Sequence, residues 1–205
     1  VSGNKIWNDK NDQDGIRPES ITINLLANGK VVDSVVVTAK DGWAWSFENL
    51  DKFAAGEEIT YTITEDAVEG YTTTINGFNV TNTHIPETIK VSGNKTWNDA
   101  NNQDGKRPES ITINLLANGK EIKDVKVTAD KNGNWTYSFE NLPKYENGKE
   151  ITYTITEDEV EGYTTTIDGF NVTNTYTPET ITVSGNKIWN DNNNQDGIRP
   201  ESITI

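Results

Sequence analysis

Alternating apolar and polar residues predict short β-strands along most of the chain. In the segment VSGNKIWND at 1–9, every second side chain lies on the same face of a strand, so Val1, Gly3, Lys5 and Trp7 share one face. The valine and the tryptophan mark that face as the buried one. Lys5 therefore occupies a position predicted to be buried, where an ammonium group without a partner is costly. We expect this lysine to face a polar partner inside the fold.

The same nine-residue segment occurs three times. It returns at 91–99 with one substitution and at 183–191 unchanged, so Lys95 and Lys187 repeat the lysine on the apolar face. Three copies of one unusual placement indicate a requirement of the fold. We divide the chain into repeats at 1–87 and 88–178 and the first strands of a third repeat at 179–205.

Each complete repeat contains about seven strand-like segments separated by turn residues, and no segment has the 3.6-residue period of an amphipathic helix. Asn28-Gly29 is a strong signal for a hairpin. These features predict an all-β fold, with each repeat a small antiparallel sandwich. The linkers PETIKV and PETITV are short and start with proline, which predicts semi-rigid repeats in a line.

Composition limits the possible functions. The hydrophobic content of 33% and the net charge of −14 lean toward disorder, but strict alternation and six tryptophans indicate folded domains. The acidic surface has no basic cluster and should repel nucleic acid and anionic lipid. Without cysteine the chain has neither disulfides nor thiolate metal sites, and no apolar run is long enough to span a bilayer. We expect no nucleic acid, membrane, metal or cofactor as a partner.

Two further polar residues fall on the buried face of predicted strands. In EEITYTITED the apolar positions Ile59, Tyr61 and Ile63 are followed at the same spacing by Glu65, and in FNVTNT the corresponding residue is Asn82. The second repeat reproduces them as Glu157 and Asn174. Each repeat therefore places a lysine, a glutamate and an asparagine on core-facing positions of different strands.

The motifs VSGNKxW, DGxRPESITINLLANGK, YTITED and NVTNT resemble the B-type repeat domains of the staphylococcal collagen adhesin and related Gram-positive surface proteins, called CnaB domains. The resemblance covers residues 1–178 and implies inverse-immunoglobulin-like, prealbumin-like Greek-key sandwiches. In that family a lysine of the first strand and an asparagine of the last become joined by a spontaneous isopeptide bond, assisted by a buried acidic residue. The implied sets are Lys5, Glu65 and Asn82, and Lys95, Glu157 and Asn174.

The residue types suit that chemistry. A lysine attacks only as the free amine, and desolvation beside Trp7 lowers its pKa and supplies that form. Burial also favours a neutral Glu65, which could hydrogen-bond the Asn82 amide oxygen and relay a proton to the departing ammonia. The reaction would occur once per molecule, so the chain is expected to modify itself and not to be an enzyme.

Several other interpretations compete. The lysine and glutamate could form an ordinary buried salt bridge, with Asn82 filling a hydrogen-bonding gap. The loop NDKNDQDG resembles a calcium loop, but Lys10 stands where the first carboxylate should be, which favours a solvated turn. A ligand or catalytic role for His84 is improbable because the second repeat has Tyr176 there. Trp43 and Trp45 alternate and are expected in the core.

The resemblance implies stalk repeats of a cell-wall-anchored surface adhesin, excised from a longer extracellular protein. Their partners would be neighbouring repeats, with a host matrix protein bound by a distal region. The alternative is an adhesin module that itself grips a host matrix protein, which should carry a unique loop or an exposed apolar patch. In the third copy, Lys187 has no counterpart of the glutamate or the asparagine, so we expect it to remain a free amine and any order there to come from the second repeat or from another molecule.

Overall fold

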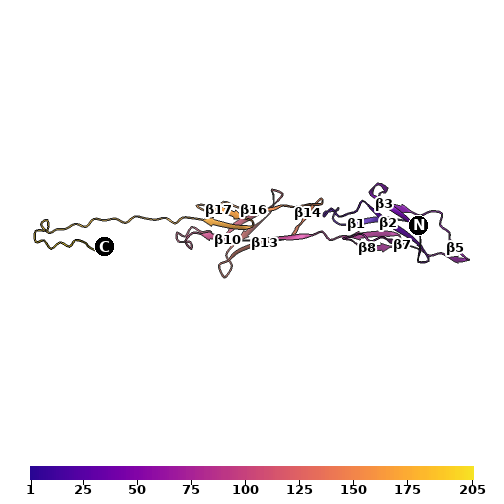
Figure 1. Cartoon of the computed structure of the whole chain (residues 1–205), viewed down its shortest axis with the longest axis horizontal. Helices are drawn as coiled ribbons and strands as arrows, with labels where there is room; N and C mark the ends of the chain where they lie inside the picture. Colours follow the sequence, from indigo (N-terminus) through magenta and orange to yellow (C-terminus); the bar gives the residue numbers. More distant parts are fainter.

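The computed structural model describes residues 1–205, which form two β-rich units end to end and an extended C-terminal segment (Figure 1). The first unit contains β1 (Ser2–Asn8), β2 (Ser20–Ala27), β3 (Lys30–Thr38), the 3-10 turn η1 (Ala39–Asp41), β4 (Ala44–Ser46), β5 (Phe53–Ala54), β6 (Glu57–Glu58), β7 (Tyr61–Glu65), β8 (Thr72–Asn76) and β9 (Asn79–Thr83). The second contains β10 (Thr88–Asn98), β11 (Ile111–Ala117), β12 (Lys120–Val127), β13 (Trp135–Pro143), β14 (Tyr145–Glu146), β15 (Lys149–Glu150), β16 (Tyr153–Glu157), β17 (Thr164–Asp168) and β18 (Asn171–Thr175).

Each unit consists of a four-stranded and a three-stranded sheet. In the first unit the strand orders are β4-β1-β9-β8 and β3-β2-β7, and in the second they are β13-β10-β18-β17 and β12-β11-β16. The short pairs β5-β6 and β14-β15 form separate ribbons. The predicted all-β fold of tandem sandwiches is confirmed.

The first and last strands of each unit are parallel neighbours. Lys5 on β1 pairs with Val80 on β9, and Trp7 pairs with Asn82. The same register joins β10 to β18 in the second unit, whereas the other strand pairs are antiparallel. A Cβ atom at Gly3 would lie 1.7 Å from the Phe78 carbonyl oxygen, so glycine allows β1 to approach the segment before β9.

The core of each unit lies between its two sheets. In the first unit the buried apolar residues come from both sheets: Ile21, Ile23, Leu25, Val37, Trp45, Phe47, Ile63 and Val80. Trp43 packs against this cluster, as the alternation of Trp43 and Trp45 predicts. The second unit has a matching cluster of 12 buried residues, so each unit has its own core.

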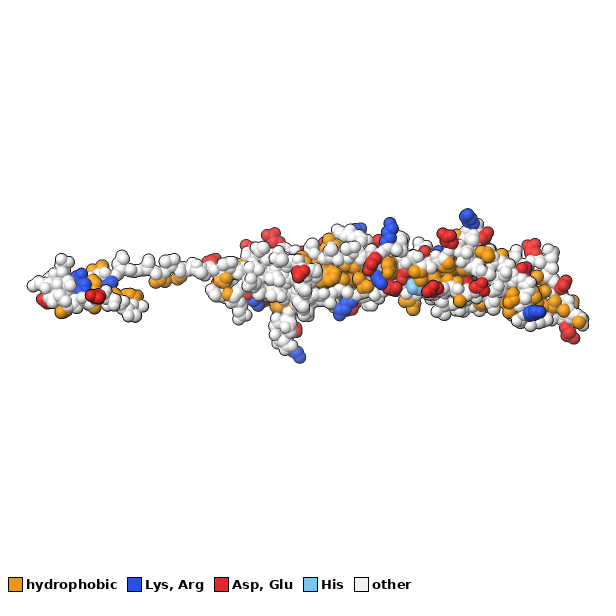
Figure 2. Space-filling model, viewed as in Figure 1, with side chains coloured by type: hydrophobic (Ala, Val, Ile, Leu, Met, Phe, Trp, Pro, Cys, Tyr) orange, Lys and Arg blue, Asp and Glu red, His pale blue; other side chains and the backbone are white.

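The linker into the second unit is short, because β9 ends at Thr83 and β10 already begins at Thr88, where it pairs with Pro143 at the end of β13. After the second unit, residues 176–205 form no strand. Apolar side chains there face solvent, as Figure 2 shows along the thin end of the molecule, and Ile181, Val183 and Ile188 are at least 80% exposed. No helix of the structure is long and apolar enough to span a membrane.

Candidate functional site: a buried lysine, glutamate and asparagine in each unit

The lysine on the apolar face of β1 lies inside the sandwich. The Lys5 side chain has no exposed surface, and its Nζ atom lies 4.5 Å from the centre of the Trp7 ring. Burial lowers the pKa of Lys5, and the neighbouring Glu65 only partly offsets this effect. In the second unit, burial lowers the pKa of Lys95 to about 8, and Glu157 opposes the shift. Both lysines are therefore easier to deprotonate than a lysine on the surface.

The glutamate reaches the lysine from the opposite sheet. Glu65 is the last residue of β7, its side chain is fully buried, and its Oε1 atom lies 2.7 Å from Lys5 Nζ. The Thr73 hydroxyl donates a hydrogen bond of 2.8 Å to the other oxygen, Oε2. A carboxylate with these two partners can exchange a proton with the lysine through Oε1 while Oε2 stays anchored.

The second unit has the same components with a different lysine position. Lys95 Nζ lies 3.6 Å from Glu157 Oε1, and that oxygen accepts no hydrogen bond. The lysine instead donates to the Thr96 carbonyl oxygen at 3.3 Å. The Thr165 hydroxyl still donates to Glu157 Oε2 at 2.8 Å. The Oε2 atom of the carboxylate is therefore held in the same way in both units, whereas the lysine contact with Oε1 differs.

The asparagine completes the cluster. Asn82 and Asn174 are fully buried, and neither the oxygen nor the nitrogen of either side-chain amide has a hydrogen-bonding partner in the protein. Lys5 pairs with Val80 on β9, and Trp7 pairs with Asn82. Asn82 lies two residues after Val80, so its side chain is on the same face of the strand as that of Val80. The structure contains the buried Lys5–Glu65 ion pair of the competing interpretation, whereas the Asn82 amide makes no hydrogen bond to the protein.

The structure therefore brings together the residues that the sequence pattern selected. In each unit the lysine and the asparagine come from adjacent parallel strands, and the glutamate comes from the facing sheet. The arrangement combines an amine with a lowered pKa, a carboxyl able to accept and return a proton, and a buried amide carbon that can be attacked. This is the set of groups required for transfer of the asparagine side-chain acyl group to the lysine amine with release of ammonia.

The Cna protein B-type domain profile matches residues 1–83, 91–175 and 183–205. The chain belongs to the Cna protein B-type domain family. A collagen adhesin of Staphylococcus aureus is 44% identical over 211 residues, which cover all of this chain and 18% of that protein. The crystal structure of two B repeat units of the S. aureus collagen binding protein Cna superposes with a TM-score of 0.80 at 43% identity, covering 98% of this chain and 55% of that one.

In the third B-type match the lysine is outside any core. Lys187 is exposed, its Nζ donates to the carbonyl oxygen of the next residue, Ile188, at 2.9 Å, and it makes no ion pair. Trp189 remains beside it, with the ring centre 4.0 Å from Nζ. The local lysine–tryptophan contact therefore persists without the fold, whereas burial does not.

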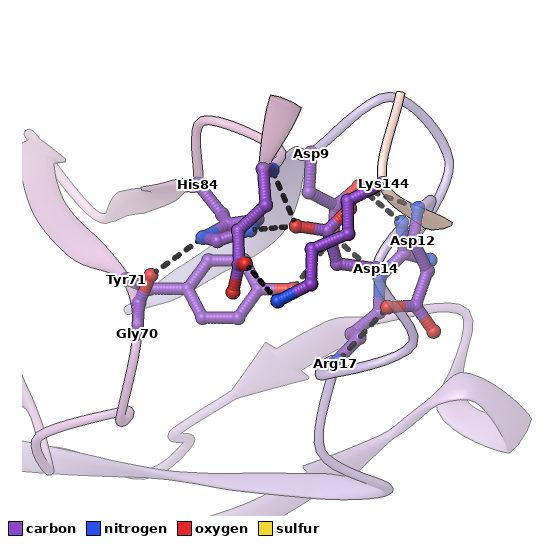
Figure 3. A network of polar contacts seen from close by, with 9 residues as sticks. Asp9, Asp12, Asp14, Arg17, Gly70, Tyr71, His84 and Lys144 are labelled. Atoms are coloured by element: carbon purple, nitrogen blue, oxygen red, sulfur yellow. Dashed lines mark hydrogen bonds and ion pairs between the residues drawn. The ribbon is translucent and has the colours of Figure 1, made fainter. Parts of the chain in front are cut away.

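A second polar network supports the B-type site at the loop after β1 (Figure 3). Arg17 donates from Nε and Nη2 to both oxygens of Asp9, at 3.0 and 2.6 Å, and Tyr71 donates to the same carboxylate at 2.9 Å. Burial opposes ionisation, but these bonds and the Asp12 amide lower the pKa of Asp9 to about 2. The Arg17 guanidinium carbon also lies 5.4 Å from the centre of the Trp7 ring, so the network contacts the same tryptophan as Lys5.

The loop whose sequence resembles a calcium loop therefore contains the Asp9–Arg17 ion pair. The structure contains no group of three or more acidic or histidine side chains able to hold a metal ion. The Asp9–Arg17 pair was not predicted from the sequence. The sequence feature that could have predicted this ion pair is an arginine eight residues after an aspartate. The same spacing occurs at Asp99–Arg107 and Asp191–Arg199, which also form ion pairs.

The junction between the two units uses a histidine that seemed unimportant in the sequence. His84 contacts the Asp14 carboxylate through Nε2 and the Gly70 carbonyl oxygen through Nδ1, both at 2.9 Å. Asp14 also accepts the Glu87 amide at 2.8 Å, and Lys144 of the second unit pairs with Glu87 at 2.8 Å. In the second unit Tyr176 replaces His84 and donates its hydroxyl to Asp104. The role of His84 is structural, in the contact that links the two units.

Proposed function

We propose that the chain is part of the stalk of a bacterial surface adhesin, and that each of its two B-type domains is closed by a Lys–Asn isopeptide bond. The bonds would join Lys5 to Asn82 and Lys95 to Asn174. The observation that carries this proposal is the asparagine amide, fully buried and without hydrogen bonds beside a buried lysine and glutamate. Leaving both atoms of a buried amide unsatisfied is costly in a purely structural role.

The proposed reaction uses these three side chains. Glu65 takes a proton from Lys5, and the free amine attacks the side-chain carbonyl carbon of Asn82. A nitrogen–carbon bond forms, the bond from that carbon to the amide nitrogen breaks, and the proton held by Glu65 passes to the departing nitrogen, which leaves as ammonia. The attacking nitrogen then gives its second proton to Glu65, which passes it to the ammonia, so the products are one amide and one ammonium ion, and the carboxylate is regenerated. The step happens once in each domain.

The strand order gives the bond a mechanical role. β1 and β9 are parallel neighbours, so a pull on the chain at the start of the unit and at its end slides one strand past the other. A covalent link between them would carry this shearing load directly. The roughly 77 residues between Lys5 and Asn82, about 260 Å if extended, would then stay folded under tension.

The stalk role extends to the whole protein. The chain spans 18% of the collagen adhesin it matches, so we assign binding of a host matrix protein to a region outside residues 1–205. We place the parent protein outside the cell, anchored to the bacterial wall through another region. We place the repeat boundaries at 87/88 and 178/179, and the start of β10 at Thr88 supports the first of them.

A second candidate function has one observation in its favour. The edge strand β3 exposes Val31, Val32 and Val36 to solvent, each more than 50% exposed, whereas the equivalent strand β12 carries Glu121 and Lys126 at the first and last of these positions. An exposed apolar edge can add a strand from a partner. If the first unit itself bound collagen, Val36→Lys would weaken the binding of the chain to immobilised collagen. We expect the chain to show no such binding.

Single glutamate variants test the proposed bond. Glu65→Ala should block the bond in the first unit only, and Glu157→Ala only in the second, because each carboxylate contacts one lysine. In intact-mass spectrometry each variant should be lighter than its sequence mass by one ammonia, and the parent chain by two. Two ammonia molecules lost from either variant would show that the carboxylate is not the proton carrier.

A further inference from the structure

Thr73 and Thr165 are the strand residues that link each glutamate to the sheet carrying the reacting groups. Their hydroxyls donate to Glu65 Oε2 and Glu157 Oε2, in both cases at 2.8 Å. Glu65 comes from the sheet β3-β2-β7, whereas Thr73 lies on β8 of the sheet β4-β1-β9-β8. The hydrogen bond therefore crosses the sandwich.

The strand order shows where this contact holds the carboxylate. β9 lies between β1 and β8, and the residues Trp7, Asn82 and Thr73 form one cross-strand row. The Glu65 carboxylate touches Lys5 on β1 with Oε1 and Thr73 on β8 with Oε2. A carboxylate that bridges the two outer strands of this trio must lie over the central strand, next to the Asn82 amide.

The threonine contact does not depend on the lysine. The Lys–Glu distance is 2.7 Å in the first unit and 3.6 Å in the second, yet the threonine–glutamate distance is the same. The threonines are exposed at the surface, while the carboxylates that they contact are fully buried. The hydroxyl is therefore the polar group on the solvent side of the cluster, and it holds the carboxylate at either lysine distance.

We propose that Thr73 and Thr165 are positioning residues for isopeptide formation, each orienting its glutamate so that Oε1 faces the lysine amine and the asparagine amide. This inference rests on the proposed function, since it concerns the rate of the same bond. Without the hydroxyl the carboxylate can rotate, and the proton transfer from lysine to the leaving nitrogen loses its alignment. The loss of one hydrogen bond to a charged group should slow bond formation roughly tenfold.

The test uses paired substitutions in the full chain. Thr73→Val keeps the shape of the side chain and removes the hydroxyl, whereas Thr73→Ser keeps the hydroxyl. Valine favours strands more than serine does, so a purely structural role predicts that the serine variant is the more damaged one. A positioning role predicts the opposite order. Thr74→Val, on the next residue of β8 and paired with Thr81, is the matched control.

The chain would be made in a short pulse of cell-free translation and quenched in acid at timed intervals, and the linked peptides would be quantified after digestion. We expect Thr73→Val to slow the Lys5–Asn82 link roughly tenfold, with Thr73→Ser and Thr74→Val near the parent rate. The Lys95–Asn174 link is the internal reference in each sample of a Thr73 variant. In Thr165→Val the Lys95–Asn174 link should be the slow one, and the Lys5–Asn82 link the reference.

Two results would overturn the inference. If Thr73→Val closes the link at the parent rate, or if Thr73→Ser is the slower variant, the hydroxyl does not position the carboxylate. These results leave the proposed bond intact, because the link still forms. If the parent chain forms neither link, the proposed function fails, and the positioning role fails with it.

Discussion

Residues 1–9 and 183–191 have the same sequence but different structures. The first copy contains β1, with Lys5 fully buried, whereas the second forms no strand and leaves Lys187 exposed. The loop that follows is alike in both, since Arg17 pairs with Asp9 at 2.6 Å and Arg199 with Asp191 at 2.5 Å. The loop ion pair therefore forms from local sequence alone. The strand, and with it the environment of the lysine, requires the neighbouring strands β4 and β9.

The largest difference between the two copies should appear when their lysines are removed. Lys5→Ala abolishes the link that closes a loop of about 77 residues, and by analogy with a disulfide the free energy of unfolding of the first unit should fall by about 4 kcal/mol. Its melting temperature should drop by more than about 15 °C in calorimetry. Lys187→Ala, the matched control, should leave the melting curve unchanged. Equal curves for both variants would contradict a stabilising bond.

A smaller contrast is expected for the two arginines. Arg17→Ala leaves the buried Asp9 carboxylate without its bidentate partner, which should cost the first unit about 2 kcal/mol. Asp191 is partly exposed and belongs to no core, so Arg199→Ala should not alter the stability of either unit. Urea unfolding of the two variants measures the difference. An Arg17→Ala effect as small as that of Arg199→Ala would mean that the ion pair acts locally and does not support the site.

The smallest effect concerns the junction and depends on pH. A carbonyl and a carboxylate can only accept hydrogen bonds, so His84 satisfies Gly70 and Asp14 together only when both ring nitrogens carry protons. The contact with Asp14 raises the pKa of His84, burial opposes the shift, and the Gly70 carbonyl adds to it. The resulting stabilisation is fully present below the unfolded pKa of about 6.5 and is lost as pH rises through the folded pKa.

Hydrogen exchange of the Glu87 amide, which donates to Asp14, reports on this junction. After correction for intrinsic exchange, its protection should decrease as the pH is raised from about 5 to 8. His84→Tyr copies the second unit, where Tyr176 donates to Asp104, and should remove the pH dependence in that range. Protection that changes with pH to the same extent in the tyrosine variant would exclude the histidine as its cause.

Much of the candidate site could be predicted from the sequence, because strand periodicity determines which face a side chain occupies. Alternation placed Lys5, Glu65 and Asn82 inside, and the structure finds all three there. Periodicity does not identify neighbouring strands, so the parallel pairing of β1 with β9 came only from the structure. Thr73 was missed because it is exposed among similar threonines, and its contact depends on how the two sheets face each other.

The junction and the third copy show the same limit. His84 gave no signal because its partners, Gly70 and Asp14, are distant in sequence and meet only in the folded unit. The segment at 183–191 has the same alternation as β1, yet it lies exposed without a partner strand. Local pattern determines what a segment can form, and the available partners determine whether it does.

The central claim is that each complete B-type domain closes itself with a covalent bond, and the mass of the intact chain tests it most directly. The full chain, denatured and free of adducts, should be lighter than its sequence mass by two ammonia molecules, with linked peptides joining Lys5 to Asn82 and Lys95 to Asn174. The Glu65→Ala/Glu157→Ala double variant should have its full sequence mass. A parent chain at its full sequence mass would contradict the account.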